Sequence, residues 1–533
     1  MLLRYITALI IILASGSIGI NAMPPHPDLE KKLILNGRIS EFVTRASAMQ
    51  SKSGMNINRA SPLSSGTMKI PVVLVQYSGT TFDAASTTAF YHDLLNGTTS
   101  SDLSVRRYYS DMSDGTLIME FDIYGPYTVS ENPAYYGSNV SGSDAHPGQL
   151  VNEAVSALIA DQGAVDFSIY DNDNNGTVDA VVVIHYGQGE EVTGTSEQIW
   201  SHQWDLASAN YYSDGDGPVI TDGVAFNVYT MQPEYMFSAG DSTVGVFCHE
   251  LGHVLGLPDL YDTSGVTNGV GNWSVMGTGS WGGTPTGSMP SPLLAWERYR
   301  IGGAGWVSLS EPGPYGVIDR DDSPGLLQVV ILFISIFLVM ASFLRTSPAV
   351  KTVSVLLSAV TLVAAVSCGD DSTSTRINGT LDDIEASHHA YRISLNDPQS
   401  EQYLFLEGKK TSAAGWYVPG TGILITHVHE GIISTYINTN AVNNGVSRVH
   451  GIDVIEASTS VEPGELWTNP AYKGSAADLF CAENNDRLTA ATVPGSSYYT
   501  GSDISTKTGD SGVTIKNISS NAAFPVTFDV SVD

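Results

Sequence analysis

Apolar, β-rich runs and stretches of helical pattern alternate along the first half of the chain. The apolar runs are KIPVVLVQYS at 69–78 and VDAVVVIHYG at 178–187, and the helical pattern includes VNEAVSALIADQG at 151–163. The second half contains three stretches that alternate like half-buried strands between Asn, Gly and Ser turns: EQYLFLEGKK (401–410), GILITHVHE (422–430) and PVTFDVSVD (525–533). The alternation in the first half indicates an α/β or an α+β core, and with the β-rich C-terminal part we expect an α+β fold.

The most apolar part of the chain lies between these two halves. Residues 326–344 form a nineteen-residue run without a charge, long enough to span a bilayer, and a second apolar run follows at 353–367. Arg345 and Lys351 separate the runs, which suits a membrane hairpin whose connection is cytoplasmic. Alternatively, the second run and the residues before it resemble a second signal sequence that ends at a lipoprotein-type Cys368 and is foreign to the fold. Buried helices are the third interpretation.

The N-terminus has the pattern of a signal peptide. Arg4 precedes an apolar run, and small residues follow before Met23, so we expect export and cleavage near Ala22. Residues 23–67 are rich in Pro, Ser and Asn around one amphipathic stretch, LEKKLILNGRISEFVTRA. This region is expected to be either a pro-segment or an N-terminal arm.

Composition narrows the class of protein. The chain is 42% hydrophobic and 15% charged, which is typical of a globular protein. Lys and Arg number 24 against 55 Asp and Glu, and the net charge of -31 argues against nucleic acid as a partner. Three cysteines are too few for a disulfide framework, although one Cys248–Cys481 bridge would be compatible with the sequence.

The stretch HELGHVLGLPDLYD at 249–262 carries the clearest chemistry. His249 and His253 are four residues apart, so a helix presents both imidazoles on one face, where they can chelate a zinc ion. Ser242 and Thr243 are candidate caps at the start of this helix. Gly256 allows the chain to leave the helix sharply.

The residues after this helix predict a catalytic rather than a structural metal site. Asp259 follows the turn and is placed to complete a site with three protein ligands and an open fourth position. Glu250 is then the candidate base that takes a proton from metal-bound water during peptide hydrolysis. Met276, in the Gly- and Ser-rich turn NWSVMGTGSW, is suited to lie beneath the histidine rings.

HELGHVLGLPDLYD together with NWSVMGTGSW resembles the secreted immune inhibitor A-type metallopeptidases, a metzincin-like family. The likeness continues through DFSIYDNDNNGTVDAVVVIHYGQGEE, EQYLFLEGKK and WYVPGTGILITHVHE, and residues 321–377 interrupt it. The resemblance implies zinc bound by His249, His253 and Asp259, with Glu250 as catalytic base and Met276 as the turn methionine.

A second metal site is suggested by DNDNNGTVD at 171–179. Asp171, Asp173, Asn175, the Thr177 carbonyl and Asp179 have the spacing of a calcium loop, but the bidentate Glu of an EF-hand is missing at its twelfth position. A structural calcium site therefore competes with a set of Asx turns that simply leads into the next strand.

Other histidines and aromatic residues have weaker signals. His185, His202, His427 and His429 are expected to be structural, although His427 and His429 alternate on one strand face and leave a second metal open. Trp281, Trp296 and Tyr299 follow the methionine turn, and core packing competes there with a substrate-lining role. Cys248, next to the first ligand, points about 100° away from it on a helix and is expected in the core.

These observations predict a division of the chain and a function. The division is a signal peptide at 1–22, a pro-segment or arm at 23–67, a metallopeptidase domain at 68–320, an apolar insertion at 321–377 and a β-rich continuation at 378–533. We expect a secreted zinc endopeptidase that cleaves proteins or peptides and is made as a precursor. The alternatives are an inactive or incomplete membrane-held surface binding protein, and an active enzyme anchored on the outer side of a membrane by 326–367 or by lipid.

Overall fold

The computed structural model describes residues 21–36, 65–98, 103–302, 306–308 and, with short gaps, 375–532. Most of the predicted signal peptide, the apolar runs at 326–367 and Cys368 lie outside these residues. Within the described ranges, no helix is both long and apolar enough to cross a bilayer. The membrane and signal interpretations of 326–367 therefore stay predictions.

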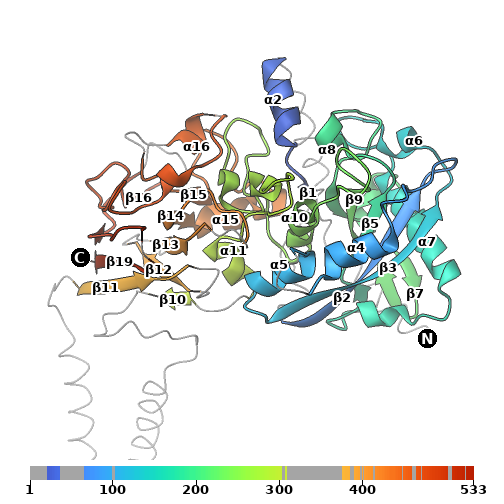
Figure 1. Ribbon diagram of the computed structural model, residues 1–533, viewed down its shortest axis with the longest axis horizontal. Coiled ribbons are helices and arrows are strands. Elements are labelled where there is room, and N and C mark those ends of the chain that lie inside the picture. The colour runs from blue at the N-terminus through green and yellow to red at the C-terminus, as the bar shows by residue number, and fades with distance from the viewer. Residues whose placement is uncertain are drawn as a thin grey trace, which may run out of the picture.

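A six-stranded mixed sheet forms the centre of the N-terminal part (Figure 1). Its strands, in spatial order, are β1 (Asn21–Ala22), β6 (His202–Asp205), β9 (Val228–Pro233), β5 (Val181–His185), β2 (Gly66–Gln76) and β3 (Leu117–Thr128). The four strands from β9 to β3 are parallel, whereas β6 is antiparallel to β9 and β1 is antiparallel to β6. The two strands predicted at 69–78 and 178–187 are confirmed as β2 and β5, which are neighbours.

Both faces of this sheet are buried, because successive side chains of β2 alternate between two cores. Ile70, Val72 and Leu74 pack into one core with α4 (Thr88–Asn96), α5 (Val105–Met112) and α10 (Val244–Val254). Val73 and Val75 pack into the other core with α7 (Pro147–Asp161), the helix predicted at 151–163. The shorter elements of this part are α2 (Pro27–Leu35), α6 (Pro133–Gly137), η1 (Phe167–Tyr170), β4 (Thr177–Val178), α8 (Glu190–Thr193), α9 (Leu206–Tyr211), β7 (Val219–Thr221), β8 (Val224–Phe226), η2 (Gly271–Trp273), η3 (Thr278–Trp281) and α11 (Ala295–Arg300).

The C-terminal part is β-rich, as predicted. A five-stranded sheet has the order β10 (Trp306–Ser308), β12 (Ala390–Ser394), β13 (Gln402–Lys409), β14 (Gly422–His429), β15 (Ile452–Val454), and a three-stranded sheet has the order β11 (Thr375–Leu381), β19 (Val526–Val532), β18 (Val513–Lys516). Its remaining elements are α15 (Glu430–Tyr436), η4 (Ile437–Thr439), α16 (Glu465–Thr468), η5 (Ala476–Asp478), β16 (Tyr498–Tyr499) and β17 (Lys507–Gly509). The last three residues of the predicted insertion, 375–377, lie in β11 and pair with β19.

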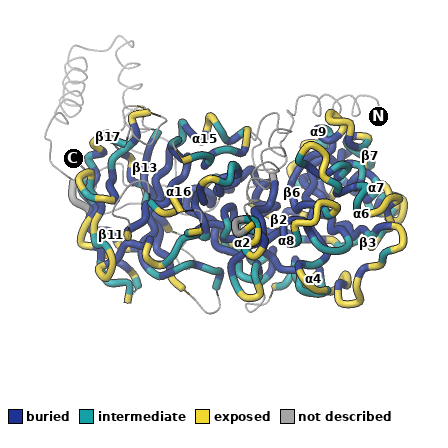
Figure 2. The backbone as a smooth tube through the Cα atoms, turned by 90° about the horizontal axis from the view of Figure 1, so that it is seen from above, coloured by how far each residue is buried: buried dark blue, intermediate teal, exposed yellow. Residues whose placement is uncertain are grey.

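The two parts share a hydrophobic core. Tyr403 and Phe405 of β13 belong to the same buried cluster as the residues that β2 sends toward α10. Hydrogen bonds reinforce this contact: the amide of Ala295 donates to Glu407 Oε1 at 2.9 Å, and Trp296 Nε1 donates to Glu430 Oε1 at 3.1 Å. Figure 2 shows buried strands running through the middle of both parts. The β-rich part therefore packs as a continuation of the first part.

Candidate metal centre

Helix α10 carries two of the three predicted ligands. All eleven of its residues are buried, so the helix runs through the core rather than along the surface. Thr243 is the N-cap residue, but its hydroxyl donates to the Thr286 carbonyl at 3.2 Å instead of accepting from the helix. Thr243 is therefore the N-cap residue, as one of the two expected candidates, but its side chain makes no capping hydrogen bond. Gly256 ends the turn after the helix with a φ of +86°, as a glycine readily does.

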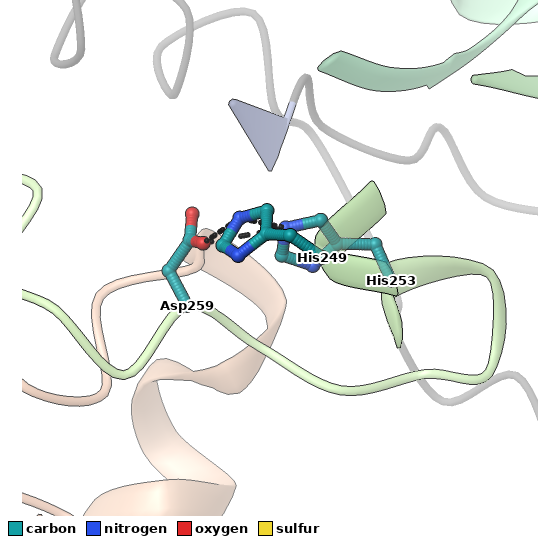
Figure 3. A group of neighbouring side chains, drawn as sticks. All are labelled: His249, His253 and Asp259. Carbon is teal, nitrogen blue, oxygen red and sulfur yellow. Dashed lines mark hydrogen bonds and ion pairs between the residues drawn. The ribbon is translucent and has the colours of Figure 1, made fainter. Parts of the chain in front are cut away.

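The structure brings His249, His253 and Asp259 together with the spacing of a tetrahedral metal site (Figure 3). Asp259 Oδ1 lies 3.1 Å from His249 Nε2 and 3.3 Å from His253 Nε2, and the two Nε2 atoms are 3.2 Å apart. Four ligands at zinc-ligand bond lengths of about 2.0–2.1 Å in a tetrahedron are separated by about 3.3 Å. The three side chains therefore fit a zinc ion without rearrangement.

The other ring nitrogens are held by backbone carbonyls, which orients both histidines. His249 Nδ1 lies 2.8 Å from the Val275 carbonyl, and His253 Nδ1 lies 2.8 Å from the Leu257 carbonyl. A carbonyl can only accept, so each Nδ1 carries the hydrogen and each Nε2 keeps its lone pair for a metal. Burial also lowers the pKa of His249, which favours the neutral, metal-binding form of its imidazole.

Asp259 supplies the anionic ligand from the loop that follows α10. Burial alone would raise the pKa of this carboxyl, but the adjacent His253 and His249 rings hold it at about 2. The side chain is only 1% exposed. A buried carboxylate that stays ionised matches a cation at this position.

Glu250 is fully buried beside the ligands. Burial raises the pKa of its carboxyl well above the usual range, and the negative charges of Asp259 and Glu191 add to this effect. Neither carboxylate oxygen has a hydrogen-bond partner among the described residues. Unpaired buried oxygens of this kind are rare and suit a group that exchanges a proton with a bound molecule.

Met276 lies against α10 between the two histidines. A Cβ atom added at Gly252 would come within 2.5 Å of Met276 Sδ, so the thioether fills the space that a glycine leaves. The Met276 carbonyl accepts the amide of Leu260 at 2.8 Å and thereby ties the methionine turn to the residue after the third ligand. Met276 thus packs against the helix that carries His249 and His253, and its role as the turn methionine stays a prediction.

Comparison with known proteins agrees with this geometry. Residues 73–307 match the family described as immune inhibitor A peptidase M6, catalytic domain. The pre-pro-metalloprotease PrtV of Vibrio cholerae serotype O1 is 35% identical to the chain over 211 residues, and immune inhibitor A of Bacillus thuringiensis subsp. alesti is 32% identical over 213 residues.

The alignments are partial on both sides. Each covers 34% of this chain, together with 22% of the Vibrio protein and 30% of the Bacillus protein. The chain therefore spans less than a third of the length of these curated relatives. The family resemblance is confirmed for the M6 domain.

A segment near the N-terminus lies beside α10, the helix that carries two of the metal-cluster residues. Residues 21–22 form β1, which pairs with β6 through Asn21–Gln203 and Ala22–His202, and the Met23 amide donates to the Ser201 carbonyl at 3.1 Å. Met23 is fully buried, and its backbone amide counteracts part of the rise in the pKa of Glu250. The first described residues of the chain thus lie directly at the candidate catalytic carboxylate.

Tryptophan and tyrosine side chains hold this segment in place. Trp200 Nε1 donates to the Met23 carbonyl at 2.7 Å, Trp281 Nε1 donates to the Pro24 carbonyl at 3.1 Å, and the Tyr261 hydroxyl donates to the Ala22 carbonyl. Trp281, one of the aromatic residues for which a substrate-lining role was considered, thus contacts the chain's own N-terminal segment beside α10. Of the other two, Trp296 is buried against the C-terminal part and Tyr299 is exposed.

The predicted calcium loop also gathers in space. Asp171, Asp173 and Asp179 each bring one oxygen to within 4.8 Å of the others. Asx turns are present as well: Asp171 Oδ1 accepts the amide of Asn175 at 2.9 Å, and Asn175 Oδ1 accepts that of Thr177 at 2.9 Å. Asp179 Oδ1 is buried without a partner, and burial raises the pKa of this carboxyl to about 6. The loop therefore has both features that the sequence suggested: the Asx turns and a group of carboxylates close enough to bind one calcium ion.

The remaining histidines do not form a further metal cluster within the described part of the chain. His202 lies 2.7 Å from the Trp200 carbonyl through Nδ1 and 3.2 Å from the Tyr229 hydroxyl through Nε2, and His185 Nδ1 lies 3.0 Å from the Tyr186 carbonyl. These two are structural, as expected. His427 and His429 are buried on β14, and neither belongs to a group of three close metal-ligand atoms among the described residues.

Both described cysteines, Cys248 and Cys481, are free and buried. The Cys248–Cys481 bridge that the sequence allowed is therefore absent. Cys248 lies in the core beside α5, where its carbonyl accepts a hydrogen bond from the Tyr109 hydroxyl at 2.5 Å. Burial raises the pKa of its thiol, which keeps the group protonated and supports the expectation of a core residue.

Sequence reasoning missed two residues around the metal cluster, Glu297 and Asn440. The Ser274 hydroxyl lies 2.8 and 2.7 Å from the two carboxyl oxygens of Glu297, which share its one hydrogen, and it accepts the amide of Met276 at 3.0 Å. Burial raises the pKa of Glu297 to about 8. Asn440 contacts Asp259 directly, from 181 residues away along the chain. Neither residue belongs to a motif of regular spacing, so no local signal points to it.

Proposed function

We propose that the chain is a secreted zinc endopeptidase that hydrolyses peptide bonds of proteins. The observation that carries this proposal is the spacing of 3.1–3.3 Å among Asp259 Oδ1 and the two histidine Nε2 atoms, beside a buried, unpaired Glu250. The M6 match of residues 73–307 and the relatives named as metalloprotease and immune inhibitor A support it. The acidic chain has no feature that favours nucleic acid as a substrate.

The chain's own residues account for the proton transfers of such a reaction. Zinc, when bound by His249, His253 and Asp259, supplies Lewis acidity toward water and the scissile carbonyl. Glu250 accepts the proton of the attacking water and passes it to the leaving amine. The carbonyls of Val275 and Leu257 keep both imidazoles in one tautomer throughout.

Glu250→Gln tests the enzymatic part of the proposal. The substitution keeps the shape of the side chain but removes the base, so casein hydrolysis should fall by roughly 10²–10⁴-fold while about one zinc per chain stays bound. A chelator should abolish hydrolysis by the unsubstituted protein. Hydrolysis that survives both the chelator and the Glu250→Gln substitution would refute a zinc peptidase.

The N-terminal segment supports a precursor form. Met23 and Pro24, which remain after cleavage near Ala22, lie at the edge of the sheet through the bond from the Met23 amide to the Ser201 carbonyl and through Trp200 and Trp281. A polypeptide bound there excludes a substrate from the same edge. The Vibrio relative carries the name pre-pro-metalloprotease. We therefore extend the proposal: a pro-segment within residues 23–67 keeps the enzyme inactive, and the residues before it direct export.

Met23→Arg tests the precursor. Met23 is fully buried, so an unpaired charge at this position should displace the segment from the edge of the sheet beside Glu250. The rate of hydrolysis of a short peptide should therefore rise. Lys31→Ala, on the exposed face of α2, is the control and should leave the rate unchanged. An unchanged rate in folded, zinc-loaded Met23→Arg would show that the segment does not block the site.

A second candidate function is a membrane-held surface protein that binds partners without catalysis. It is favoured by the apolar runs at 326–367 and Cys368, which lie outside the described residues. Fractionation of cells expressing the chain between membrane and medium separates a secreted from an anchored protein. Deletion of 321–374 spares β11, and release of an active enzyme by this deletion would assign the anchoring to the apolar segment.

We also propose a structural calcium site in the loop at 171–179, formed by Asp171, Asp173, Asn175, the Thr177 carbonyl and Asp179. Its support is the group of three carboxylates of Asp171, Asp173 and Asp179. One of their oxygens, Asp179 Oδ1, is buried and has no hydrogen-bond partner among the described residues. Oxygen donors of this kind are the ligands that Ca²⁺ prefers. Calcium would then stabilise the entry to β5, one of the two middle strands of the six-stranded sheet.

A further inference from the structure

The loop that carries Asp259 has no regular structure of its own. Residues 257–260 follow α10 without forming helix or strand, and the Met276 carbonyl fixes the backbone at Leu260. This backbone contact leaves the direction of the Asp259 carboxylate undetermined. A metal ligand needs a fixed direction, because affinity depends on the partners that orient its side chain.

Asn440 contacts Asp259 at two points. The amide nitrogen of Asp259 donates to Asn440 Oδ1 at 2.7 Å, and Asn440 Nδ2 donates to Asp259 Oδ2. The first bond fixes the backbone of Asp259 and the second fixes the rotation of its side chain. Because Oδ2 is used by Asn440, Oδ1 is left facing the two histidine Nε2 atoms at 3.1 and 3.3 Å.

Asn440 is itself rigidly placed. It ends η4 with a φ of +49°, a left-handed conformation that asparagine tolerates, and it is 2% exposed. Asn443, in the same segment, donates to the Leu260 carbonyl at 2.9 Å and accepts the amide of Ile452 at 3.1 Å. Ile452 begins β15, so the segment links the Asp259 loop to the C-terminal sheet.

We propose that Asn440 is a positioning residue for the third metal ligand, so that the metal centre is completed by the C-terminal part of the chain. Figure 3 shows the ribbon of that part, in pale orange, passing beside Asp259. Asn440 lies outside the matched residues 73–307 and beyond the apolar segment in sequence. The inference rests on the proposed zinc site, and it adds that the M6 region alone cannot orient Asp259.

The test compares Asn440→Gly with Asn444→Ala in the full chain. Glycine accepts a φ of +49° without strain, so Asn440→Gly removes the amide contacts and little else. Asn444 is the matched control: it binds Thr263, farther along the same loop, through its side-chain oxygen at 3.0 Å and its amide at 2.8 Å. Zinc affinity is measured by competition with a coloured chelator, and unfolding of the metal-free proteins is followed by circular dichroism.

We expect Asn440→Gly to bind zinc roughly 10–100-fold more weakly, as is typical when a partner of a metal ligand is removed. Asn444→Ala should stay within about threefold of the unsubstituted protein. With Co²⁺ in place of Zn²⁺, the visible bands that report tetrahedral coordination should change in Asn440→Gly alone, which a general loss of stability would not cause.

Unchanged zinc affinity and an unchanged Co²⁺ spectrum in Asn440→Gly would overturn the inference while leaving the zinc peptidase intact. Equal losses in both variants would also overturn it, because the segment would then act through loop stability. Failure of the unsubstituted chain to bind zinc would instead refute the proposed function.

If Asn440→Gly does not fold, Asn440→Asp replaces it: aspartate tolerates the same φ and keeps an acceptor, but offers no donor to Oδ2. Normal zinc binding by Asn440→Asp would then count against the inference.

Discussion

The structure contains two clusters of side chains that suit a metal ion, and they differ in what surrounds them. His249, His253 and Asp259 are all buried, and each is oriented by a hydrogen bond from outside the cluster. In the 171–179 loop, Asp179 is buried but Asp173 is exposed, and the carboxylates of Asp171 and Asp173 accept amides of the same loop. The first cluster is held ready for a metal by the fold, whereas the second is partly satisfied without one.

This difference shows what spacing in a sequence can and cannot indicate. Both motifs have the regular ligand positions of a known site. The partners that orient the first cluster come from Val275, Leu257 and Asn440, which no motif contains. A cluster whose ligands are oriented by hydrogen bonds from other segments should bind its metal ion tightly and lose affinity on substitution of those partners. A loop whose carboxylates already accept its own amides should bind a metal ion weakly.

The largest effect should come from the first cluster. His253→Ala leaves two ligands, so zinc content should fall from about one per chain to near zero, and casein hydrolysis should disappear with it. Asp171→Asn is the matched change in the other cluster and should leave zinc content unchanged. Metal analysis by mass spectrometry checks both variants. Zinc retained in His253→Ala would show that the ion is bound elsewhere.

Gly252→Ala should have the next largest effect. Alanine is the better helix former by about 1 kcal/mol, so on propensity alone the variant should be more stable. Its Cβ would instead meet Met276 Sδ at 2.5 Å and push the thioether away from α10. We expect a lower melting temperature and weaker zinc binding, with partial recovery in Gly252→Ala combined with Met276→Ala. A melting temperature above that of the unsubstituted protein would contradict the contact.

Calcium should have a moderate effect that is confined to the second cluster. Addition of millimolar Ca²⁺ to zinc-loaded protein should raise the melting temperature by a few degrees, because the ion binds only the folded loop. The rise should vanish in Asp171→Asn and persist in Glu250→Gln. An equal rise in Asp171→Asn would place any calcium outside this loop and favour the Asx-turn interpretation.

The smallest effect concerns pH in the absence of calcium. Burial raises the pKa of Asp179 from 3.8 to about 6, so between these values the folded state holds a proton that the unfolded state has lost. This group's contribution therefore makes the protein less stable as pH rises from about 4 to about 6. Asp179→Asn should flatten this part of the pH profile, measured by urea unfolding in a chelator. A profile of unchanged slope would show that Asp179 is not buried in solution.

Much of the fold and the metal cluster could be predicted from the sequence because the signals are local. The strands β2, β5, β13, β14 and β19 and the helix α10 follow from apolar patterns within a few residues. The two histidines and Asp259 lie within eleven residues of chain, where helix geometry and one turn determine their positions.

The rest depended on contacts between distant segments. The pairing of β1 with β6 joins residues about 180 positions apart, and Asn440 reaches Asp259 over 181 positions. Thr243 is the N-cap residue of α10, but its hydroxyl donates to the Thr286 carbonyl, 43 residues away along the chain, which local sequence could not indicate. Such contacts are decided by packing, and a single sequence contains no periodic signal for them.

The position of β1 has a consequence for the exported protein. β1 covers the edge of the six-stranded sheet at β6, and an uncovered edge strand is a template for pairing with other chains. Asn21 and Ala22, which form β1, are the last two residues of the predicted signal peptide. Cleavage after Ala22 would therefore remove β1 and open β6 to any extended polypeptide, including a second copy of the same chain, so that export and the risk of self-association would begin with one event.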